Sequence, residues 1–316
     1  MNKIKRKLLK AYRERMLWEF IKGKFLKFFK SKISKKLIVI KDKSILERTD
    51  IAKSRHLIEK EYAWYRRKPK RRLIENQTVP PKIIWWCWLQ GEENISELSK
   101  ICLSSLKKKF SDYEINIITN DNLQTYIDIP KVILKKYHAG IIASAHFSDV
   151  IRLLLLKKYG GLWVDASVFC SSNKAKEIIE SSQLFMYQNG LLDGNRDIKV
   201  SNWLISCEKG NPIISDSAEL LCDYWIKHSY DVNYFVTHLL MTMVIDKYKD
   251  QWNEIPAFNN VSPHLMVKEL NNKFDSKRFE QLNEMSSFHK LNNHVTYEDN
   301  GTLYGYLKKQ YLGSEK

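Results

Sequence analysis

The chain has 316 residues, of which 44% are hydrophobic and 12% aromatic, and its formal net charge is +17. This length allows one large domain, or one domain with an appendage, with a full buried core. The five cysteines are scattered without CxxC or CxxH spacing, which argues against a zinc site and predicts reduced thiols in a cytosolic compartment.

The basic charge is concentrated at the N-terminus. Residues 1–36 contain fourteen Lys or Arg against Glu14 and Glu19, a net charge of +12. Apolar residues recur among them at helical spacing: Ile4, Leu8, Leu9, Tyr12, Met16, Leu17, Phe20, Ile21, Phe25, Phe28 and Phe29. A lysine-rich helix with one apolar stripe is typical of a segment that lies in the headgroup region of an anionic membrane.

Two other roles are open for residues 1–36. Basic helices also bind nucleic acid, but a stripe of leucine and aromatic residues fits phosphate contacts poorly, and no nucleic-acid motif follows. The helix could instead pack on the rest of the protein. Because no run approaches the roughly 20 apolar residues of a membrane span and no signal peptide is evident, we expect a cytoplasmic protein held peripherally on the inner face of the plasma membrane.

A second helix is predicted over residues 44–65. It ends in a basic run over residues 66–72, where Pro69 and repulsion between like charges interrupt regular structure. We therefore predict an N-terminal helical region over residues 1–77 and a catalytic domain over residues 78–310.

From Pro80 onward, strands and helices alternate. Strands are predicted over residues 82–89 and 114–119, and helices over residues 96–110 and 130–137. The first strand is apolar on both faces, as in a parallel sheet that is covered on both sides. This order predicts an α/β fold with a mostly parallel sheet between helices, and ligands bind such sheets at the carboxyl ends of the strands.

Residues 143–170 form the central stretch of the sequence. They predict a buried helix, a stop at Gly160-Gly161 and one strand over residues 162–169. Asp149 and Arg152 stand three apart on one face of the helix, where they can pair with each other or with a polar ligand.

On the predicted strand, Trp163, Asp165 and Ser167 share one face. Two oxygen ligands at positions i and i+2 can hold one hard divalent cation, which can in turn bridge a diphosphate. Each residue taken alone is more often an ordinary surface side chain, and the combination carries the prediction.

The pattern SD-x-x-R-x-x-x-L-x-x-x-GG-x-W-x-D-x-S resembles the donor site of retaining, GT-A-fold glycosyltransferases of family 32, the DXD group, and within it the bacterial capsular polysaccharide synthesis proteins. The resemblance implies that Asp149 and Arg152 contact the donor's sugar and phosphates, that Trp163 packs on the nucleotide, and that Asp165 holds Mn²⁺ or Mg²⁺. Ser167 stands where the general pattern has its second carboxylate.

The same resemblance assigns Trp88, at the end of the first strand, to stacking on a uracil-type base, and Asn120 or Asp121 to the base or ribose. Each of these three residues could also have a purely structural role. Tryptophan is more often a core residue, and Asn-Asp-Asn is common turn chemistry.

The C-terminal half continues the alternation. Helices are predicted over residues 175–181, 213–228 and 234–248, and strands over residues 184–187 and 200–207. Asn202 resembles part of a motif of the capsular group and is a candidate sugar contact. By resemblance, His289 completes the metal shell and Lys290 meets the leaving diphosphate, while His238 is explained as well by a structural role.

The sequence therefore predicts a metal-dependent, retaining hexosyltransferase that moves a sugar from a UDP-sugar to a saccharide or lipid-linked acceptor in capsular or cell-surface polysaccharide synthesis. Other enzymes of that synthesis are expected partners. Breaking the anomeric bond builds negative charge on the diphosphate, which the metal, Arg152 and Lys290 would stabilise. Two alternatives stay open: a non-catalytic nucleotide-sugar-binding membrane protein, with Ser167 as its sign, and a basic nucleic-acid-binding protein.

Overall fold

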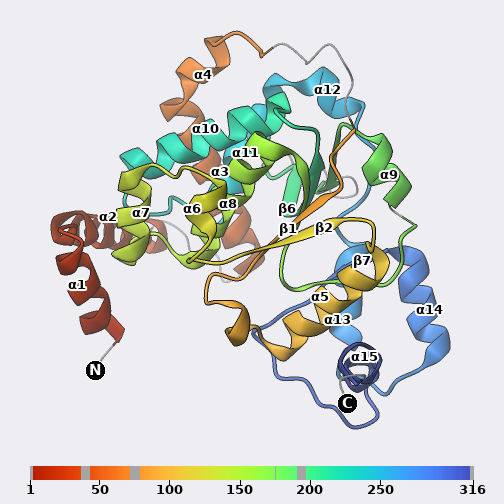
Figure 1. Ribbon diagram of the computed structural model, residues 1–316. Coiled ribbons are helices and arrows are strands. Elements are labelled where there is room, and N and C mark those ends of the chain that lie inside the picture. The colour runs from red at the N-terminus through yellow and green to blue at the C-terminus, as the bar shows by residue number, and fades with distance from the viewer. Residues whose placement is uncertain (1–2, 37–42, 72–78, 175, 191–196, 314–316) are drawn as a thin grey trace.

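A computed structural model describes residues 3–36, 43–71, 79–174, 176–190 and 197–313 (Figure 1). Its centre is a five-stranded sheet in the order β2-β1-β3-β6-β5. The strands of this sheet are β1 (Ile83–Cys87), β2 (Glu114–Ile118), β3 (Gly161–Val164), β5 (Leu184–Gln188) and β6 (Val200–Cys207). β2, β1 and β3 are parallel, whereas β6 is antiparallel to both of its neighbours. The expected α/β class, with a mostly parallel sheet between helices, is confirmed.

Helices cover both faces of the sheet. Those after β1 are α5 (Glu97–Lys109), α6 (Leu123–Tyr126), α7 (Lys131–His138), α8 (Ser144–Tyr159), α9 (Lys176–Ser181), α10 (Pro212–Lys227), α11 (Val236–Lys247), α12 (Lys249–Asn253), α13 (Met266–Glu269), α14 (Ser276–Met285) and α15 (Leu303–Leu312), with 3-10 turns at Glu92–Asn94 and Ser262–His264. Alternation along the strands divides the core. Trp85 and Trp163 pack with α8, α10 and α11, while Trp86 and Leu162 pack with α5 on the other face.

Most predicted elements lie within a few residues of their expected positions. β6 has the predicted bounds. Ser96 caps α5 by accepting a hydrogen bond from the backbone N–H of Ser99 at 3.3 Å, and Pro130 directly precedes α7. α9 begins at Lys176, and residue 175, where its start was predicted, lies outside the described residues.

The strand predicted over residues 162–169 is interrupted. β3 ends at Val164, and a turn follows in which the backbone N–H of Val168 donates to the carbonyl of Asp165 at 3.0 Å. The next strand, β4 (Val168–Cys170), pairs with β7 (Phe288–Lys290) in a separate two-stranded sheet. The prediction of one continuous strand was wrong, and a turn places Asp165 and Ser167.

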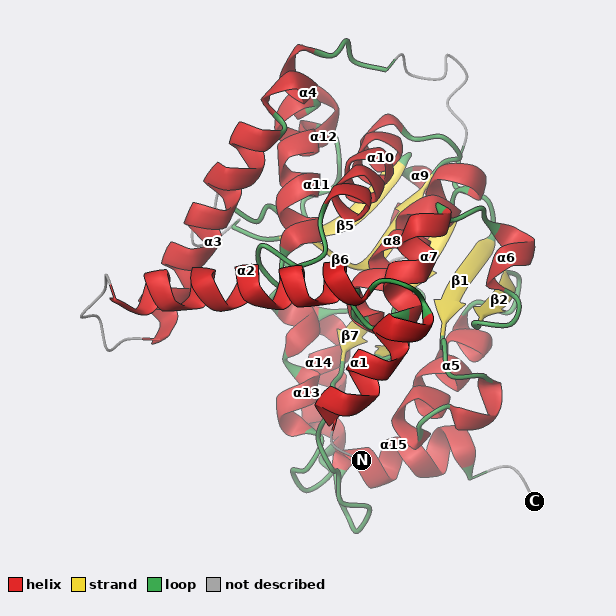
Figure 2. Cartoon of the chain, turned by 90° about the vertical axis from the view of Figure 1, so that its left-hand side faces the viewer, coloured by secondary structure: helices red, strands yellow, loops and turns green. Residues whose placement is uncertain are grey.

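The single helix predicted over residues 1–36 is two helices. α1 (Lys3–Arg13) and α2 (Leu17–Lys36) meet at a break where Arg15 has φ of +56°. Figure 2 shows α2 lying across the molecule, with its later turns extending beyond the body. Ala11 and Phe20 are buried against Ala139, so part of the predicted apolar stripe packs on the rest of the protein.

Close contacts fix α2 in this seat. A Cβ atom on Gly23 would lie 2.3 Å from the carbonyl oxygen of Ser229, so only glycine fits there without a shift. Ser229 Oγ donates to Glu19 Oε2 at 2.8 Å, and Lys27 Nζ contacts Asp231 Oδ1 at 2.6 Å. The segment between α10 and α11 therefore holds the N-terminal helix.

The opposite side of α1 and α2 exposes large apolar side chains: Leu9, Tyr12, Trp18, Ile21, Phe25, Leu26 and Phe28. We call these residues the exposed apolar face. Trp18 is 73% exposed and Tyr12 70%. Within the described part of the chain, none of the helices combines the length and apolarity that a membrane crossing needs.

The remaining N-terminal helices belong to the main core. α3 (Lys43–Glu61) and α4 (Ala63–Arg67) replace the single helix predicted over residues 44–65. Ile58, Tyr62 and Tyr65 pack in the same cluster as α8 and α11, and Tyr65 Oη donates to Asp216 Oδ2 at 2.6 Å. The boundary predicted at residue 77 lies outside the described residues, and α3 shares the core of the sheet domain instead of having its own.

Candidate functional site

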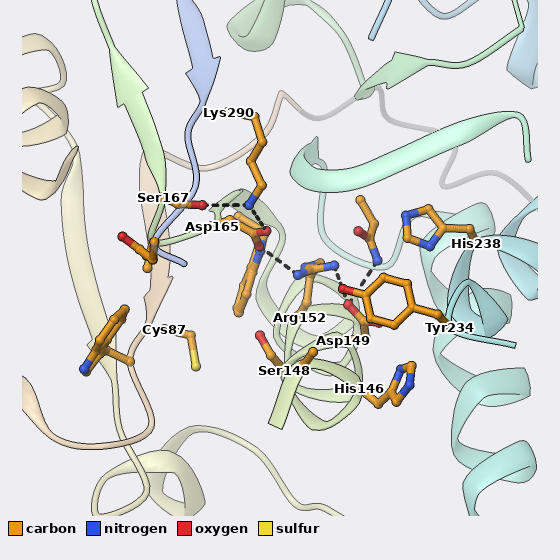
Figure 3. Close-up of a pocket in the computed structure, with 16 residues that line it drawn as sticks. Cys87, His146, Ser148, Asp149, Arg152, Asp165, Ser167, Tyr234, His238 and Lys290 are labelled. Atoms are coloured by element: carbon orange, nitrogen blue, oxygen red, sulfur yellow. Dashed lines mark hydrogen bonds and ion pairs between the residues drawn. The ribbon is translucent and has the colours of Figure 1, made fainter. Parts of the chain in front are cut away.

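A cavity of about 240 Å³ opens at the carboxyl ends of β1 and β3 (Figure 3). Its wall is formed by the first turns of α8, the turn after β3, β6, the start of α11 and the end of β7. The side chains that matter most below are Trp88, Asp149, Arg152, Asp165, Ser167, Asn202, Tyr234, His238 and Lys290. This is the edge of the sheet at which the sequence predicts ligand binding, and we call this cavity the donor pocket after the sugar donor that the family resemblance leads us to expect there.

Arg152 joins the helical and strand sides of the donor pocket. Its Nη1 donates to Asp149 Oδ1 at 2.7 Å, and its Nη2 donates to Asp165 Oδ1 at 2.8 Å. The guanidinium carbon lies 4.9 Å from the centre of the Trp163 ring, and the residue is only 3% exposed. Arg152 Nε is buried and has no hydrogen-bond partner among the described residues, which leaves one donor unsatisfied beside the cavity.

Asp165 is shared by two cations. Besides Arg152, it accepts a hydrogen bond from Trp163 Nε1 at 2.8 Å on Oδ1 and one from Lys290 Nζ at 2.7 Å on Oδ2. Figure 3 shows Lys290 and Arg152 approaching this carboxylate from two sides. Burial by itself raises the pKa of Asp165, but Lys290 and Arg152 together hold that pKa below its ordinary value, so the carboxylate is ionised.

Asp149 is an anchor for three other side chains. Its Oδ1 accepts hydrogen bonds from Arg152 and, at 3.0 Å, from Asn202 Nδ2, and its Oδ2 accepts one from Thr237 Oγ1 at 2.8 Å. The structure thus brings together Asp149, Arg152, Asp165 and Asn202, as predicted. Thr237 was missed because α11 lies about ninety residues further along the chain.

The two predicted nucleotide-packing residues of the pocket, Trp163 and Trp88, differ in how much of the ring a ligand can reach. Trp163 is 1% exposed and supports Arg152 and Asp165, so it offers almost no surface on which a nucleotide could pack. Trp88 is partly exposed, stacks on Trp86 at 6.1 Å, and lines the cavity. Asn120 and Asp121 are exposed in the turn after β2 and do not line it.

His289 does not join the predicted metal site. It is fully buried, its Nε2 lies 3.0 Å from Ser171 Oγ, and its ring packs 6.2 Å from that of Phe169. Neighbouring residues on a strand face opposite sides, and the next residue, Lys290, is the one that reaches the pocket. Burial lowers the pKa of His289 to about 3, which fits a neutral ring in the protein interior. The prediction of His289 as a metal ligand was wrong.

Asp165 and Ser167 nevertheless converge on one position for a cation. Lys290 Nζ donates to Asp165 Oδ2 at 2.7 Å and to Ser167 Oγ at 2.9 Å, so an ammonium group lies where both oxygens point. Within the described residues, no three His, Cys, Asp or Glu side chains gather to hold a metal ion. A divalent ion at this position would therefore have only two protein oxygens as ligands. Phosphate oxygens and water would have to complete its coordination.

The far wall of the pocket was largely missed by the sequence analysis. Tyr234 is 65% exposed and, like His238, lies across the pocket from Cys87 (Figure 3). Burial lowers the pKa of His238 to about 4, so it is neutral near pH 7. Burial also raises the pKa of Cys87 to about 12, which excludes a thiolate nucleophile at that position.

Comparison with known proteins adds three findings. A family model described as capsular polysaccharide synthesis protein matches residues 11–309. "O-glycosyltransferase braB" from Annulohypoxylon truncatum is 22% identical over 158 residues, which are 46% of this chain and 38% of that protein, so the chain spans less than half of this relative. A solved structure, "PaToxG Glycosyltransferase", is 16% identical with a TM-score of 0.39, over 86% of this chain and 90% of that one.

Proposed function

Because the chain belongs to the capsular polysaccharide synthesis protein family, we propose that it is a retaining glycosyltransferase that moves a sugar from a nucleotide-diphosphate donor to a saccharide acceptor. One observation carries the proposal. Arg152 and Lys290 meet at Asp165 inside a pocket at the carboxyl ends of β1 and β3. Two cations held in this way suit a ligand with two phosphates.

The donor is a nucleoside diphosphate sugar, and we propose a UDP-sugar. Its diphosphate would meet Lys290 Nζ and the second N–H groups of Arg152 Nη1 and Nη2, because each of these nitrogens uses only one N–H for a carboxylate. The base would lie on the partly exposed ring of Trp88, which is backed by Trp86. Stacking of a base on an aromatic ring contributes about 1–3 kcal/mol in other nucleotide complexes.

The reaction breaks the bond between the anomeric carbon and a phosphate oxygen. Positive charge then grows on the sugar ring and negative charge on the departing diphosphate. Arg152 and Lys290 stabilise that negative charge from fixed positions, because Asp149 and Trp163 hold the guanidinium before the ligand arrives. Asp149 acts as a positioning residue, since both of its oxygens already accept hydrogen bonds from protein groups.

A divalent cation is part of the proposal, and Asp165 and Ser167 are the residues that would hold it. The positive charges of Arg152 and Lys290 are already paired with the carboxylates of Asp149 and Asp165. When bound, a divalent ion would therefore neutralise further negative charge on the diphosphate. With His289 turned away, the protein ligands are oxygens only, and this set suits Mg²⁺ as well as Mn²⁺. The nitrogen ligand that would favour Mn²⁺, the softer of the two ions, is missing from this set.

We further propose that the exposed apolar face of α1 and α2 rests on an anionic membrane surface from the cytoplasmic side. The helices combine that face with the +12 charge of residues 1–36, which complements anionic headgroups. A saccharide on a lipid carrier would then reach an enzyme held at the same surface.

The function is tested by thermal unfolding with UDP, GDP, CMP and a DNA oligonucleotide, each with and without Mg²⁺, followed by assays of UDP release from UDP-sugars. We expect UDP to raise the melting temperature most, because a ligand that binds only the folded state stabilises it. A shift by the oligonucleotide alone would identify a nucleic-acid-binding protein. Stabilisation by UDP without release of UDP from any UDP-sugar would indicate a binding protein that lacks the chemistry.

A further inference from the structure

A second and larger cavity, of about 880 Å³, lies beside the donor pocket. The two cavities share Asp165, Asn202, Tyr234, His238 and Lys290, so they meet at the proposed site of bond cleavage. The second cavity is walled by the end of β5, by β6 and by the segment between α12 and α13. We call it the amide groove, because each of these three segments contributes carboxamide side chains to its lining.

The carboxamides are held rigidly and still have N–H groups to offer. Asn259 Oδ1 accepts hydrogen bonds from the backbone N–H groups of Val261 and Ser262, both at 2.9 Å. Asn260 Nδ2 donates to Asn189 Oδ1 at 2.9 Å. These contacts fix the amide planes, and among the described residues none accepts from the side-chain NH₂ of Asn189 or Asn259.

Gln188 carries the strongest signal in the groove. It is only 8% exposed, and its backbone is fixed by hydrogen bonds with Phe258 and Asn260 at 2.7 and 3.0 Å. No described residue hydrogen-bonds its side-chain amide, which lines the groove. An amide that lines a cavity and has no protein partner among the described residues can donate to and accept from a polar ligand there, so this position favours a polar ligand.

The lining defines the chemistry of that ligand. Carboxamides offer neutral donors and acceptors in pairs, which match the hydroxyl groups of a sugar, while Tyr234 and Phe235 offer aromatic surface to the apolar face of a sugar ring. Apart from the shared Asp165 and Lys290, the charged residues of the described wall, Glu47 and Lys268, are exposed. The lining therefore fits an uncharged saccharide better than an anionic one.

We propose that the amide groove is the subsite for the acceptor, and that it takes a neutral saccharide. This inference rests on the proposed transferase function. An acceptor hydroxyl that enters from the groove forms its bond to the anomeric carbon as the bond from that carbon to the phosphate oxygen breaks. The electron pair of the broken bond leaves with the diphosphate, and the hydroxyl proton passes to the departing phosphate oxygen.

The test is saturation-transfer NMR with the methyl glycosides of glucose, galactose, mannose and N-acetylglucosamine, in the presence of UDP. The full-length protein is compared with Gln188→Leu, which replaces the amide by a shorter apolar side chain. Asn189→Ala changes a less buried residue of the same groove and serves if the leucine variant does not fold. Gln124→Leu, on the exposed surface of α6, is the matched control.

We expect at least one glycoside to bind the wild-type protein and the control, and to bind Gln188→Leu and Asn189→Ala about tenfold more weakly, the effect of one lost hydrogen bond. Stabilisation by UDP should be the same in all four proteins. Unchanged glycoside binding in the groove variants, or no glycoside binding to a wild-type protein that does bind UDP, overturns the inference. A wild-type protein that binds no nucleotide would instead count against the proposed function.

Discussion

Arg152 is the side chain on which the donor pocket depends most. One guanidinium contacts two carboxylates on two different elements and covers the Trp163 ring, so it fixes α8 relative to the end of β3. A single ammonium group cannot make both contacts in that planar geometry. We therefore expect Arg152→Lys to weaken UDP binding about 10- to 100-fold, the range for losing a charge-assisted hydrogen bond.

Isothermal titration of UDP measures this effect. The matched control is Arg278→Lys, because Arg278 pairs with Glu269 on the exposed surface. Equal UDP affinity in Arg152→Lys and wild type would show that Arg152 serves only to hold Asp149 and Asp165. A melting curve for each variant separates lost binding from lost folding.

The metal site has a distinct residue-scale prediction. One carboxylate and one hydroxyl form a weak site, so we expect Mn²⁺ to bind measurably only when UDP supplies phosphate oxygens. Electron paramagnetic resonance of free Mn²⁺ reports this directly, without an activity assay. Asp165→Asn should abolish the UDP-dependent binding, and Ser167→Asp should strengthen it.

His289→Gln should leave that binding unchanged, because His289 faces the interior. Loss of Mn²⁺ binding in a folded His289→Gln protein would restore His289 as a ligand. The strand β7, which was not predicted from the sequence, supplies the reason why His289 faces the interior. Two adjacent residues of one strand face opposite sides, so His289 and Lys290 could not both reach the pocket.

At the scale of elements, amphipathic helices show why a pattern alone is ambiguous. An apolar stripe has the same spacing whether it packs on protein or on lipid. Here the predicted stripe is divided between two environments: Phe20 packs on Ala139, whereas Tyr12 and Ile21 stay exposed. Packing on the protein and contact with a membrane therefore belong to opposite sides of the same helices. The packing is observed, and the membrane contact is proposed.

The membrane role predicts that Trp18→Ser weakens binding to vesicles that contain phosphatidylglycerol. Removing a 73%-exposed indole takes away apolar surface that would otherwise enter the lipid. Sedimentation with vesicles measures the change, and added salt should weaken binding further because it screens the lysines. Met285→Ser, which alters an exposed side chain on α14, should have no effect. Equal sedimentation of all variants, or salt-insensitive binding, would reject the membrane surface.

These substitutions are better probes than deletion of residues 1–36. Deletion would also uncover the seat of α2 on Ala139 and Ser229, and its effects would mix lost membrane contact with exposed core.

The turn after β3 is an element that the sequence did not reveal. Alternation predicted that Asp165 and Ser167 share a face, and the structure brings both to Lys290 by a turn instead. The pairing partner of β4 is β7, about 120 residues later in the chain. The spacing of residues within β4 cannot predict such a distant partner. The two side chains do lie together, for a reason other than the one given, and the metal site stays a prediction.

At the scale of the whole molecule, the order of the central strands and of the long helices between them was predictable from apolar periodicity, whereas β7 and the helices after α11 were not predicted. Asp149, Arg152, Asp165 and Asn202 were also predictable as one site. Thr237 and Tyr234 were not, since they reach the pocket from α11 and the segment before it through tertiary packing alone. The relation to glycosyltransferase family 32 stays a prediction.

Buried histidines make the stability of the fold depend on pH. In the unfolded chain a histidine takes up its proton near pH 6.5, whereas burial lowers the pKa to about 4 for His238 and about 3 for His289. Between these values the unfolded state binds more protons, so the free energy of unfolding falls as the pH drops below about 6.5. Each histidine contributes up to about 1.4 kcal/mol per pH unit.

Urea unfolding between pH 7 and pH 5 measures this slope. We expect a shallower slope in His238→Asn than in the wild type, while His294→Asn, on the exposed surface, keeps the wild-type slope. Identical slopes in all three proteins would mean that His238 is protonated in the folded state.

The contacts of α2 with later parts of the chain also determine when this helix can dock during synthesis. A ribosome releases α1 and α2 long before it has made Ala139, Ser229 or Asp231, the residues on which α2 comes to rest. For most of synthesis these two helices have both apolar sides uncovered and no place in the protein to dock. With the proposed membrane association, the nascent chain is tethered to lipid first, and the donor pocket is completed afterwards in a polypeptide that is already at the surface where it will work.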